Sequence, residues 1–270
     1  MDSAGAPIGR ARNLRAKARS GKNLYGIFCD IPSPQIVEMA GLSGFDFAFV
    51  DAEHTAASAE SVEHMVRAAE TRGISAIVRV ASHQHAGILR HLDSGADGIL
   101  VPLVESADQV RSIIDAVKYP PAGKRGLAHV RAANYGIRTA LGDYSQRANE
   151  ETLIAIQVET AEAVRNFESI VAVDDLDAIF FGATDLASSM GLGSAIKMSG
   201  SDQPEMIDLI QKLGKIAMAA GKVVGVSAHS PAAYQRWSHA GFRFNATVAT
   251  LQFGRALTGL LQGCGHNAEL

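Results

Sequence analysis

The chain has 270 residues, of which 47% are hydrophobic and 20% charged, and its net charge is −3. These values are typical of a globular protein, and they show no basic or acidic excess that would indicate a nucleic-acid partner or a membrane surface. No stretch approaches the roughly 18 uninterrupted apolar residues that cross a bilayer. The two cysteines, Cys29 and Cys264, lie in no metal-binding spacing and are a poor basis for a disulfide framework, so we expect a cytoplasmic protein.

The N-terminal segment, residues 1–22, contains a basic run that reaches from Arg10 to Arg19. An organellar targeting peptide is one interpretation of such a run. We favour a short helix over residues 13–19, because that segment leads through Gly21 directly into the first apolar run.

Short apolar runs with the length of buried strands recur along the rest of the chain. The predicted strands are Tyr25–Cys29, Phe45–Asp51, Ala76–Val80, Gly98–Pro102, Leu153–Glu159, Ala178–Gly182, Val223–Ser227 and Arg243–Thr247.

Helical patterns fill most of the gaps between these runs. In residues 61–69, for example, Val62, Met65, Val66 and Ala69 follow the i, i+3, i+4, i+7 spacing of one buried helical face. The predicted helices are Pro34–Ala40, Ala59–Glu70, His85–Leu92, Ala107–Val117, Ala161–Ile170, Gln203–Ala220 and Pro231–His239.

The alternation of strands and helices predicts an α/β protein with one domain, residues 1–270, folded as a (β/α)₈ TIM barrel. A C-terminal helix and tail are expected from about residue 255. Two irregular segments interrupt the alternation. The segment between Pro102 and Leu153 contains Pro120 and Pro121, and we interpret it as a loop over one barrel mouth. The Gly- and Ser-rich segment Gly191–Pro204 is the second loop.

Ionisable residues gather at the predicted carboxyl ends of the strands, where barrel enzymes place their working groups. Asp51, Glu53 and His54 end the second run, Arg79 lies at the end of the third, Gln157 and Glu159 end the fifth, and Asp185 follows the sixth. Each has a structural alternative, such as a helix cap or a strand-end arginine. Their convergence on one mouth favours an active site.

These residue types suit proton abstraction beside a 2-oxo acid. Glu159 and Asp185 supply the hard oxygen ligands that Mg²⁺ or Mn²⁺ prefers. His54 would be the base, oriented by Asp51, and Arg79 would stabilise an enolate oxygen.

The main-chain N–H groups of Ala183, Thr184 and Asp185 precede a helix and would receive the substrate carboxylate.

Several blocks of sequence together resemble the HpcH/HpaI aldolase family, over roughly residues 25 to 250. The blocks occur in the order found in that family. They are Val50-Asp-Ala-Glu-His54, Val78-Arg-Val80, Leu92-Asp-Ser-Gly-Ala96, Gly98-Ile-Leu-Val-Pro102, Tyr119-Pro-Pro-Ala-Gly-Lys-Arg-Gly126, Gln157-Val-Glu-Thr160 and Gly182-Ala-Thr-Asp-Leu-Ala187.

The resemblance implies a class II aldolase that acts on pyruvate and an aldehyde. By the family pattern, Glu159 and Asp185 bind the divalent metal, which is Mg²⁺ or Mn²⁺, with Co²⁺ as a further option. His54 paired with Asp51 acts as the base through water, and Arg79 binds the pyruvate oxygen. In the same way Gln157 is expected beside the substrate.

The pattern also has consequences for assembly. Asp93 matches an aspartate that is supplied across a subunit contact, and the C-terminal helix is expected to be exchanged between subunits. A homo-oligomer follows, either a hexamer of exchanged-helix dimers or a dimer.

The chain departs from the pattern mainly where the acceptor substrate would bind. Phe242–Ala249 lacks the small-polar-Asp ending that is expected near strand eight, and Ala183 stands where a proline is usual. Lys124, Arg125 and Arg131 could contact a second carboxylate on a longer substrate.

Two alternatives stay open. One is a condensation or decarboxylation that uses oxaloacetate or a ketone with the same enolate chemistry, as in citrate synthesis. The other is a non-catalytic oligomeric barrel. Neither involves nucleic acid or a membrane.

Overall fold

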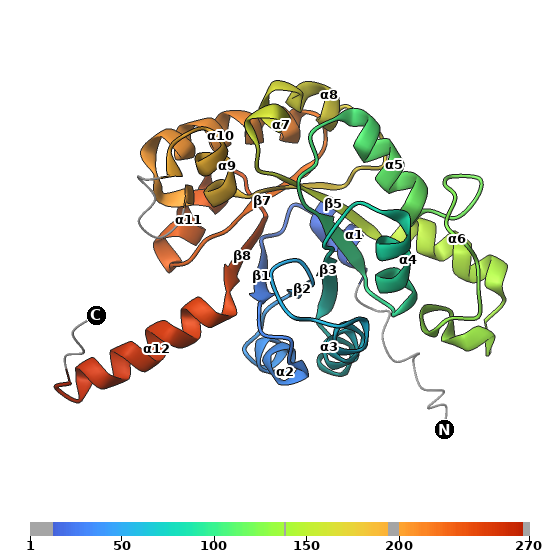
Figure 1. Ribbon diagram of the computed structural model, residues 1–270, viewed down its shortest axis with the longest axis horizontal. Helices are drawn as coiled ribbons and strands as arrows, with labels where there is room; N and C mark the ends of the chain where they lie inside the picture. Colours follow the sequence, from blue (N-terminus) through green and yellow to red (C-terminus); the bar gives the residue numbers. More distant parts are fainter. Residues whose placement is uncertain (1–12, 138, 194–199, 267–270) are drawn as a thin grey trace.

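The computed structural model describes residues 13–137, 139–193 and 200–266. Eight parallel strands alternate with helices and form a barrel, so the predicted (β/α)₈ fold is confirmed (Figure 1). The strands are β1 (Leu24–Cys29), β2 (Phe47–Asp51), β3 (Ser75–Arg79), β4 (Gly98–Val101), β5 (Leu153–Val158), β6 (Ala178–Phe181), β7 (Val223–Val226) and β8 (Phe244–Val248).

Neighbouring strands pair in chain order from β1 to β7, and β8 pairs with β1 over Leu24–Phe28. The barrel closes between β7 and β8 through a bridge of Ser227 with Ala246. All strand carboxyl ends therefore open at one end of the barrel, which positions the side chains of the candidate site.

The helices are α1 (Leu14–Arg19), α2 (Pro34–Leu42), α3 (Ala59–Arg72), α4 (His85–Asp93), α5 (Ala107–Val117), α6 (Leu141–Glu151), α7 (Ala161–Arg165), α8 (Phe167–Val171), α9 (Ala183–Ser189), α10 (Pro204–Ala219), α11 (Pro231–His239) and α12 (Ala249–Gly263). Short 3₁₀ helices occur at Arg131–Gly136 and Gly200–Asp202. The helix predicted over residues 161–170 is broken into α7 and α8 at Asn166, whose side chain donates to the Glu105 carbonyl over 2.9 Å.

The interior of the barrel is filled by aromatic side chains. Phe47 stacks on Phe244 and Phe28 stacks on Phe49, with ring centroids 4.4 Å apart in both pairs. Phe180 contacts this group edge-on. Burial of such large side chains is the main stabilising term of a core, and it leaves only the strand ends for polar groups.

Helix α1 covers the N-terminal end of the barrel. Leu14 and Ala18 join the interior apolar cluster, and Arg15 Nε donates to Asp177 Oδ1 over 2.7 Å just before β6. The predicted N-terminal helix is therefore present, and it separates that end of the barrel from solvent.

Helix α12 projects away from the barrel (Figure 1). Its one buried residue is Ala249, while Phe253, Leu257, Leu260 and Leu261 are exposed. Within the described part of the chain, we find no helix with both the length and the apolar character that a membrane crossing requires.

Candidate active site

The carboxyl ends of β2, β3, β5 and β6 bring the predicted site residues to one cavity of about 250 Å³. Asp51 ends β2, His54 follows it, and Arg79 ends β3. Gln157 comes from β5, and Asp185 lies in the first turn of α9. Residues more than a hundred positions apart in the chain thus share one wall, at the barrel end where catalysis occurs in this fold.

Asp51 and Arg79 form a two-point ion pair at the centre of this wall. They are direct neighbours in the β2–β3 register. Arg79 Nε donates to Asp51 Oδ1 over 2.9 Å, and Nη2 donates to Oδ2 over 2.7 Å. Burial raises the pKa of Asp51, but the Arg79 hydrogen bond and charge outweigh that effect, so the pKa lies below its usual value. The pair is therefore ionised and fixed near neutral pH.

The Asp51 carboxylate does not contact the His54 imidazole, so the predicted pairing of these two side chains is wrong. Asp51 Oδ1 accepts from the main-chain N–H of His54 over 3.3 Å, and from that of Glu53 over 3.0 Å. The ring of His54 lies instead beside Glu53, with Nε2 3.5 Å from Oε2. The reason is the strand register, which directs the Asp51 carboxylate across the barrel end toward Arg79.

Glu53, to which the sequence prediction assigns no role in catalysis, contacts both Arg79 and His54. Its Oε2 lies 3.4 Å from Arg79 Nε and 3.5 Å from His54 Nε2, and it is buried without a hydrogen-bond partner. Burial raises the pKa of Glu53, Arg79 and His54 lower it, and the carboxylates of Asp51 and Asp185 raise it, with a net upward shift. Its position two residues after Asp51 was the one sequence signal for it.

Glu159 is a buried carboxylate next to the cavity, with 3% of its surface exposed. Its Oε1 accepts from the Leu103 N–H over 2.7 Å, and its Oε2 accepts from the Gln157 amide. Burial raises the pKa of Glu159 to about 7, and the charges of Asp185 and Glu53 act in the same direction. The charges of two other carboxylates thus act on Glu159 beside the cavity.

Two main-chain features position Glu159, and neither has a strong sequence signal. Leu103 has a positive φ of 54°, which non-glycine residues rarely adopt, and this conformation supports the hydrogen bond from its N–H. Gly182 leaves room on the other side, because a Cβ there would lie 2.5 Å from Glu159 Oε2.

The carboxylates fit a hard divalent cation. Among residues 13–137, 139–193 and 200–266, no three His, Cys, Asp or Glu side chains form a complete ligand set. Mg²⁺ and Mn²⁺, however, commonly bind to one or two carboxylates and complete their shell with water and substrate. The charge of Asp185 raises the electrostatic cost of ionising Glu159, which a bound cation would relieve. Gln157 Oε1 is buried beside them without a partner.

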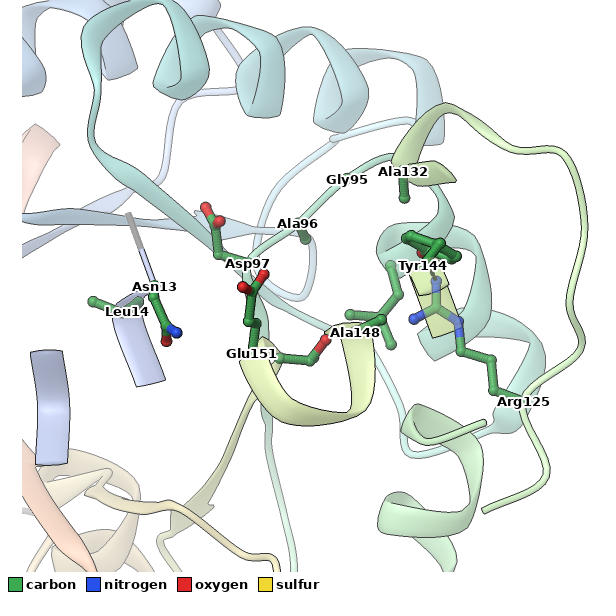
Figure 2. Close-up of a pocket in the computed structure, with 12 residues that line it drawn as sticks. Asn13, Leu14, Gly95, Ala96, Asp97, Arg125, Ala132, Tyr144, Ala148 and Glu151 are labelled. Carbon is green, nitrogen blue, oxygen red and sulfur yellow. Dashed lines mark hydrogen bonds between the residues drawn. The ribbon is translucent and has the colours of Figure 1, made fainter. Parts of the chain in front are cut away.

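Residues 118–137 and 139–152 of the predicted loop between β4 and β5 lie at one end of the barrel, but that end is not the active-site mouth. Arg125 is 2% exposed and lies at a pocket formed by Asp97, Thr152 and Asn13 (Figure 2). Asp97 and Thr152 directly precede β4 and β5, so this pocket is at the opposite end of the barrel.

Arg125 and Arg131 are instead structural in this chain. Arg125 donates to Asp93 Oδ1 over 2.8 Å, and its guanidinium lies 4.6 Å from the centre of the Tyr119 ring. Arg131 pairs with Glu70 and donates to the Ser94 carbonyl. Contact of these arginines with a substrate in the same subunit is excluded by their location. Asp93 likewise lies away from the mouth of its own barrel.

Residues 24–250 match the family model described as HpcH/HpaI aldolase/citrate lyase. The chain belongs to this family. A 4-hydroxy-2-oxovalerate aldolase of Novosphingobium aromaticivorans is 36% identical to this HpcH/HpaI chain over 235 residues, which are 87% of either protein. An HpcH/HpaI aldolase/citrate lyase family protein of Burkholderia cenocepacia J2315 has a TM-score of 0.86 at 28% identity, covering 94% of this chain and 99% of that one.

A solved citrate synthase, SbnG, is also similar to this HpcH/HpaI protein, with a TM-score of 0.83 at 29% identity over 94% of this chain and 98% of that chain. Several relatives that are similar in sequence are aldolases, and the predicted enzyme class is confirmed as a class II aldolase, a carbon–carbon lyase. Divalent-metal dependence is a property of this family.

Proposed function

We propose that this aldolase forms or cleaves 4-hydroxy-2-oxo acids by way of the enolate of pyruvate, with an aldehyde as the acceptor. The observation that carries the proposal is the set of opposed charges around one cavity. The carboxylates Glu159 and Asp185 face a guanidinium, Arg79, and an imidazole, His54. The first pair suits a cation and the second pair suits an anion that develops during proton removal.

Glu159 and Asp185 would hold the divalent metal, for which we propose Mg²⁺ or Mn²⁺, with Co²⁺ as a further option. When bound there, the cation acts as a Lewis acid on the 2-oxo group of the substrate. Gln157 would lie beside the substrate, since its amide already donates to Glu159 and its oxygen has no partner.

Arg79 would bind the oxygen that becomes the enolate. Asp51 holds two of its N–H groups, which fixes the plane of the guanidinium while its other donors are left for the substrate. Donors that are already oriented lose little freedom when charge develops, and such preorganisation is often the largest catalytic term. The role of Asp51 is then to position Arg79.

His54 would take the proton from the methyl carbon of pyruvate, through water. Its side chain is 64% exposed at the cavity rim, so solvent can reach it. Glu53 lies near enough to stabilise the imidazolium that forms. The substrate carboxylate would lie against the main-chain N–H groups of Ala183, Thr184 and Asp185, at the start of α9.

A proton-exchange experiment tests this chemistry without any acceptor. Metal-free and Mg²⁺-loaded protein would be incubated with pyruvate in D₂O, and the methyl signal followed by proton NMR. We expect metal-dependent exchange that is lost in His54→Ala and Arg79→Ala. His64→Ala and Arg111→Ala, which change exposed residues on α3 and α5, serve as matched controls and should exchange normally. No exchange with Mg²⁺, Mn²⁺ or Co²⁺ would contradict the proposal.

The similarity to a citrate synthase favours one alternative, in which oxaloacetate or another ketone replaces the aldehyde. The enolate step is the same in both cases, so proton exchange does not separate them. Product analysis with pyruvate and either an aldehyde or oxaloacetate does. We expect turnover with aldehydes, and condensation only with the ketone would favour the alternative.

We also propose that α12 is exchanged between two copies of the chain, in the cytoplasm. Phe253, Leu257 and Leu260 present apolar surface to solvent. An apolar pocket of about 470 Å³ between Tyr25, Phe45 and Tyr234 lies outside β1 and β8. Covering both surfaces would remove two exposed apolar areas together.

Light scattering of the full chain tests this assembly. We expect a dimer or hexamer, and the double variant Leu257→Asp and Leu260→Asp should shift it toward monomer. Gln262→Glu, an added charge at another exposed position of α12, is the control. A monomeric unmodified chain would contradict the exchange.

A further inference from the structure

One side of the active-site cavity is not used by the chemistry described above. The metal-binding, base and enolate-binding side chains come from β2, β3, β5 and β6. The remaining wall comes from β7, β8 and β1, which are neighbours in the barrel. It is formed by Ser227, Val248, Phe28 and Asp30, and we call these four residues the acceptor wall.

Two members of the acceptor wall give it a rigid apolar surface. The ring of Phe28 stacks on Phe49, and the Arg79 guanidinium lies 4.9 Å from its centre. Val248 ends β8 next to it, at the position that pairs with Phe28. An acceptor carbon chain placed here would therefore be short and would contact side chains that cannot easily move.

Asp30 adds a fixed negative charge to this wall. Its Oδ1 accepts from the Thr250 N–H over 3.1 Å, and its Oδ2 accepts from the Thr250 hydroxyl. The carboxylate thus caps the start of α12 from a distant part of the chain. A carboxylate held by two hydrogen bonds stays at the cavity wall.

The described wall offers no cation for a second carboxylate. Of the described residues that line this cavity, Arg79 and His54 are the basic ones. Arg79 is paired with Asp51, and His54 lies on the β2 side. Arg125 and Arg131 lie at the other end of the barrel. A carboxylate on the acceptor would therefore be repelled by Asp30, and no basic side chain of this wall would offset the repulsion.

We propose that the acceptor is a short uncharged aldehyde with a hydroxyl group next to the carbonyl, and that Asp30 selects it. The inference rests on the proposed pyruvate aldolase function. Asp30 accepts a hydrogen bond from the hydroxyl group, Ser227 donates one to it, and the charge of Asp30 repels anionic aldehydes. In the reaction, the methyl carbon of pyruvate bonds to the aldehyde carbon, and the aldehyde oxygen gains the proton that the methyl group lost.

Three two-carbon aldehydes distinguish the hydrogen bond to the acceptor hydroxyl group from the charge repulsion by Asp30. Glycolaldehyde carries the hydroxyl group, acetaldehyde has a methyl group in place of CH₂OH, and glyoxylate has a carboxylate in place of CH₂OH. kcat/KM for each would be measured at saturating pyruvate and Mg²⁺. Because these aldehydes are hydrated to different extents, each variant is compared with the unmodified enzyme on the same aldehyde.

In Asp30→Asn we expect kcat/KM for glyoxylate to rise about 10- to 100-fold and that for glycolaldehyde to fall about 10-fold, with acetaldehyde unchanged. Ser227→Ala should reduce only the glycolaldehyde value. Asp108→Asn, an exposed acid on α5, is the matched control and should change none. The gain for glyoxylate in Asp30→Asn should shrink at high salt.

Thr250→Val tests the structural role of Asp30, because it removes the hydroxyl hydrogen bond to Asp30 Oδ2 but keeps the main-chain hydrogen bond and the charge of Asp30. That variant should still reject glyoxylate, even if its melting temperature falls. If pyruvate still exchanges in D₂O but the ratios of kcat/KM among the three aldehydes are the same in the unmodified enzyme and in Asp30→Asn, this inference is overturned. Loss of the exchange itself in the unmodified enzyme would instead overturn the proposed function.

Discussion

Replacing Asp51 with asparagine tests which residue Asp51 serves. The substitution Asp51→Asn keeps Oδ1, which accepts from the Glu53 and His54 N–H groups, so the loop after β2 stays in place. It changes Oδ2 into an NH₂ group that faces Arg79 Nη2, donor against donor. The 2.7 Å hydrogen bond between those atoms is then lost.

The magnitude follows from the burial of the pair. The Asp51 and Arg79 side chains are 1% and 12% exposed, so solvent screens them little. Loss of one charge-assisted hydrogen bond in such a place costs about 2 to 3 kcal/mol. If this cost is expressed in transition-state binding, kcat/KM falls about 30- to 150-fold.

A pair of double-mutant cycles assigns the effect. Asp51→Asn would be combined with Arg79→Lys, which cannot form the two-point pair, and separately with His54→Ala. We expect non-additivity of about 1.5 kcal/mol or more with Arg79→Lys, and additivity within about 0.5 kcal/mol with His54→Ala. The cycle with Arg79→Lys can be read from pyruvate exchange rates, and the cycle with His54→Ala, in which exchange is lost, from the free energy of unfolding. The reverse pattern would refute the structural assignment and restore the Asp51–His54 pair expected from sequence.

Gly182→Ala should weaken Mn²⁺ binding, measured by calorimetry, at least tenfold, because the added Cβ would lie 2.5 Å from Glu159 Oε2. Gly142→Ala is the control, since a Cβ there meets open space. Equal Mn²⁺ affinities of the two variants would contradict the reasoning. Metal affinity should be constant above pH 7 and fall about tenfold per unit below it, since Glu159, with its pKa raised to about 7, must lose its proton to bind the cation. A flat profile from pH 5 to 8 would count against Glu159 as a ligand. Arg125→Ala should leave the KM for the acceptor unchanged. It should lower the free energy of unfolding, measured by denaturant titration, by about 2 to 4 kcal/mol, because it removes a buried partner of Asp93. A raised acceptor KM without lost stability would contradict the location of Arg125.

The barrel itself was predictable because its signals are local. Apolar runs of strand length and helices with one apolar face are encoded within ten or fifteen residues, and the observed strands start or end within a few residues of the predicted ones. Helix α6 was missed because Tyr144 is its one buried residue, which leaves almost no apolar periodicity to detect.

Contacts that depend on strand register could not be predicted in the same way. Asp51 and Arg79 are 28 positions apart, and they meet because both end adjacent strands at the same level. His54, only three residues from Asp51, suggested itself as the partner by its closeness in sequence. The long segment after β4 posed a related problem, since two prolines indicate an irregular path but do not specify the end of the barrel at which it lies.

The contribution of Leu103 has a further origin. Its N–H and its positive φ hold Glu159, while its side chain is exposed. A main-chain donor has no residue-type signature, so such a role becomes visible only in three dimensions.

The closure between β7 and β8 has a consequence for motion. Strand β8 pairs with β1 from Phe244 to Val248, but it meets β7 through the bridge of Ser227 with Ala246. The Val226 N–H donates over 3.3 Å to the side chain of Asn245. Amides at a junction with so few main-chain bonds exchange their protons through small, frequent openings. Ser227 lies at this junction, whereas Phe28 and Val248 lie on the fully paired β1–β8 edge, so we expect faster amide exchange around Ser227 than around the rigid apolar part of the acceptor wall.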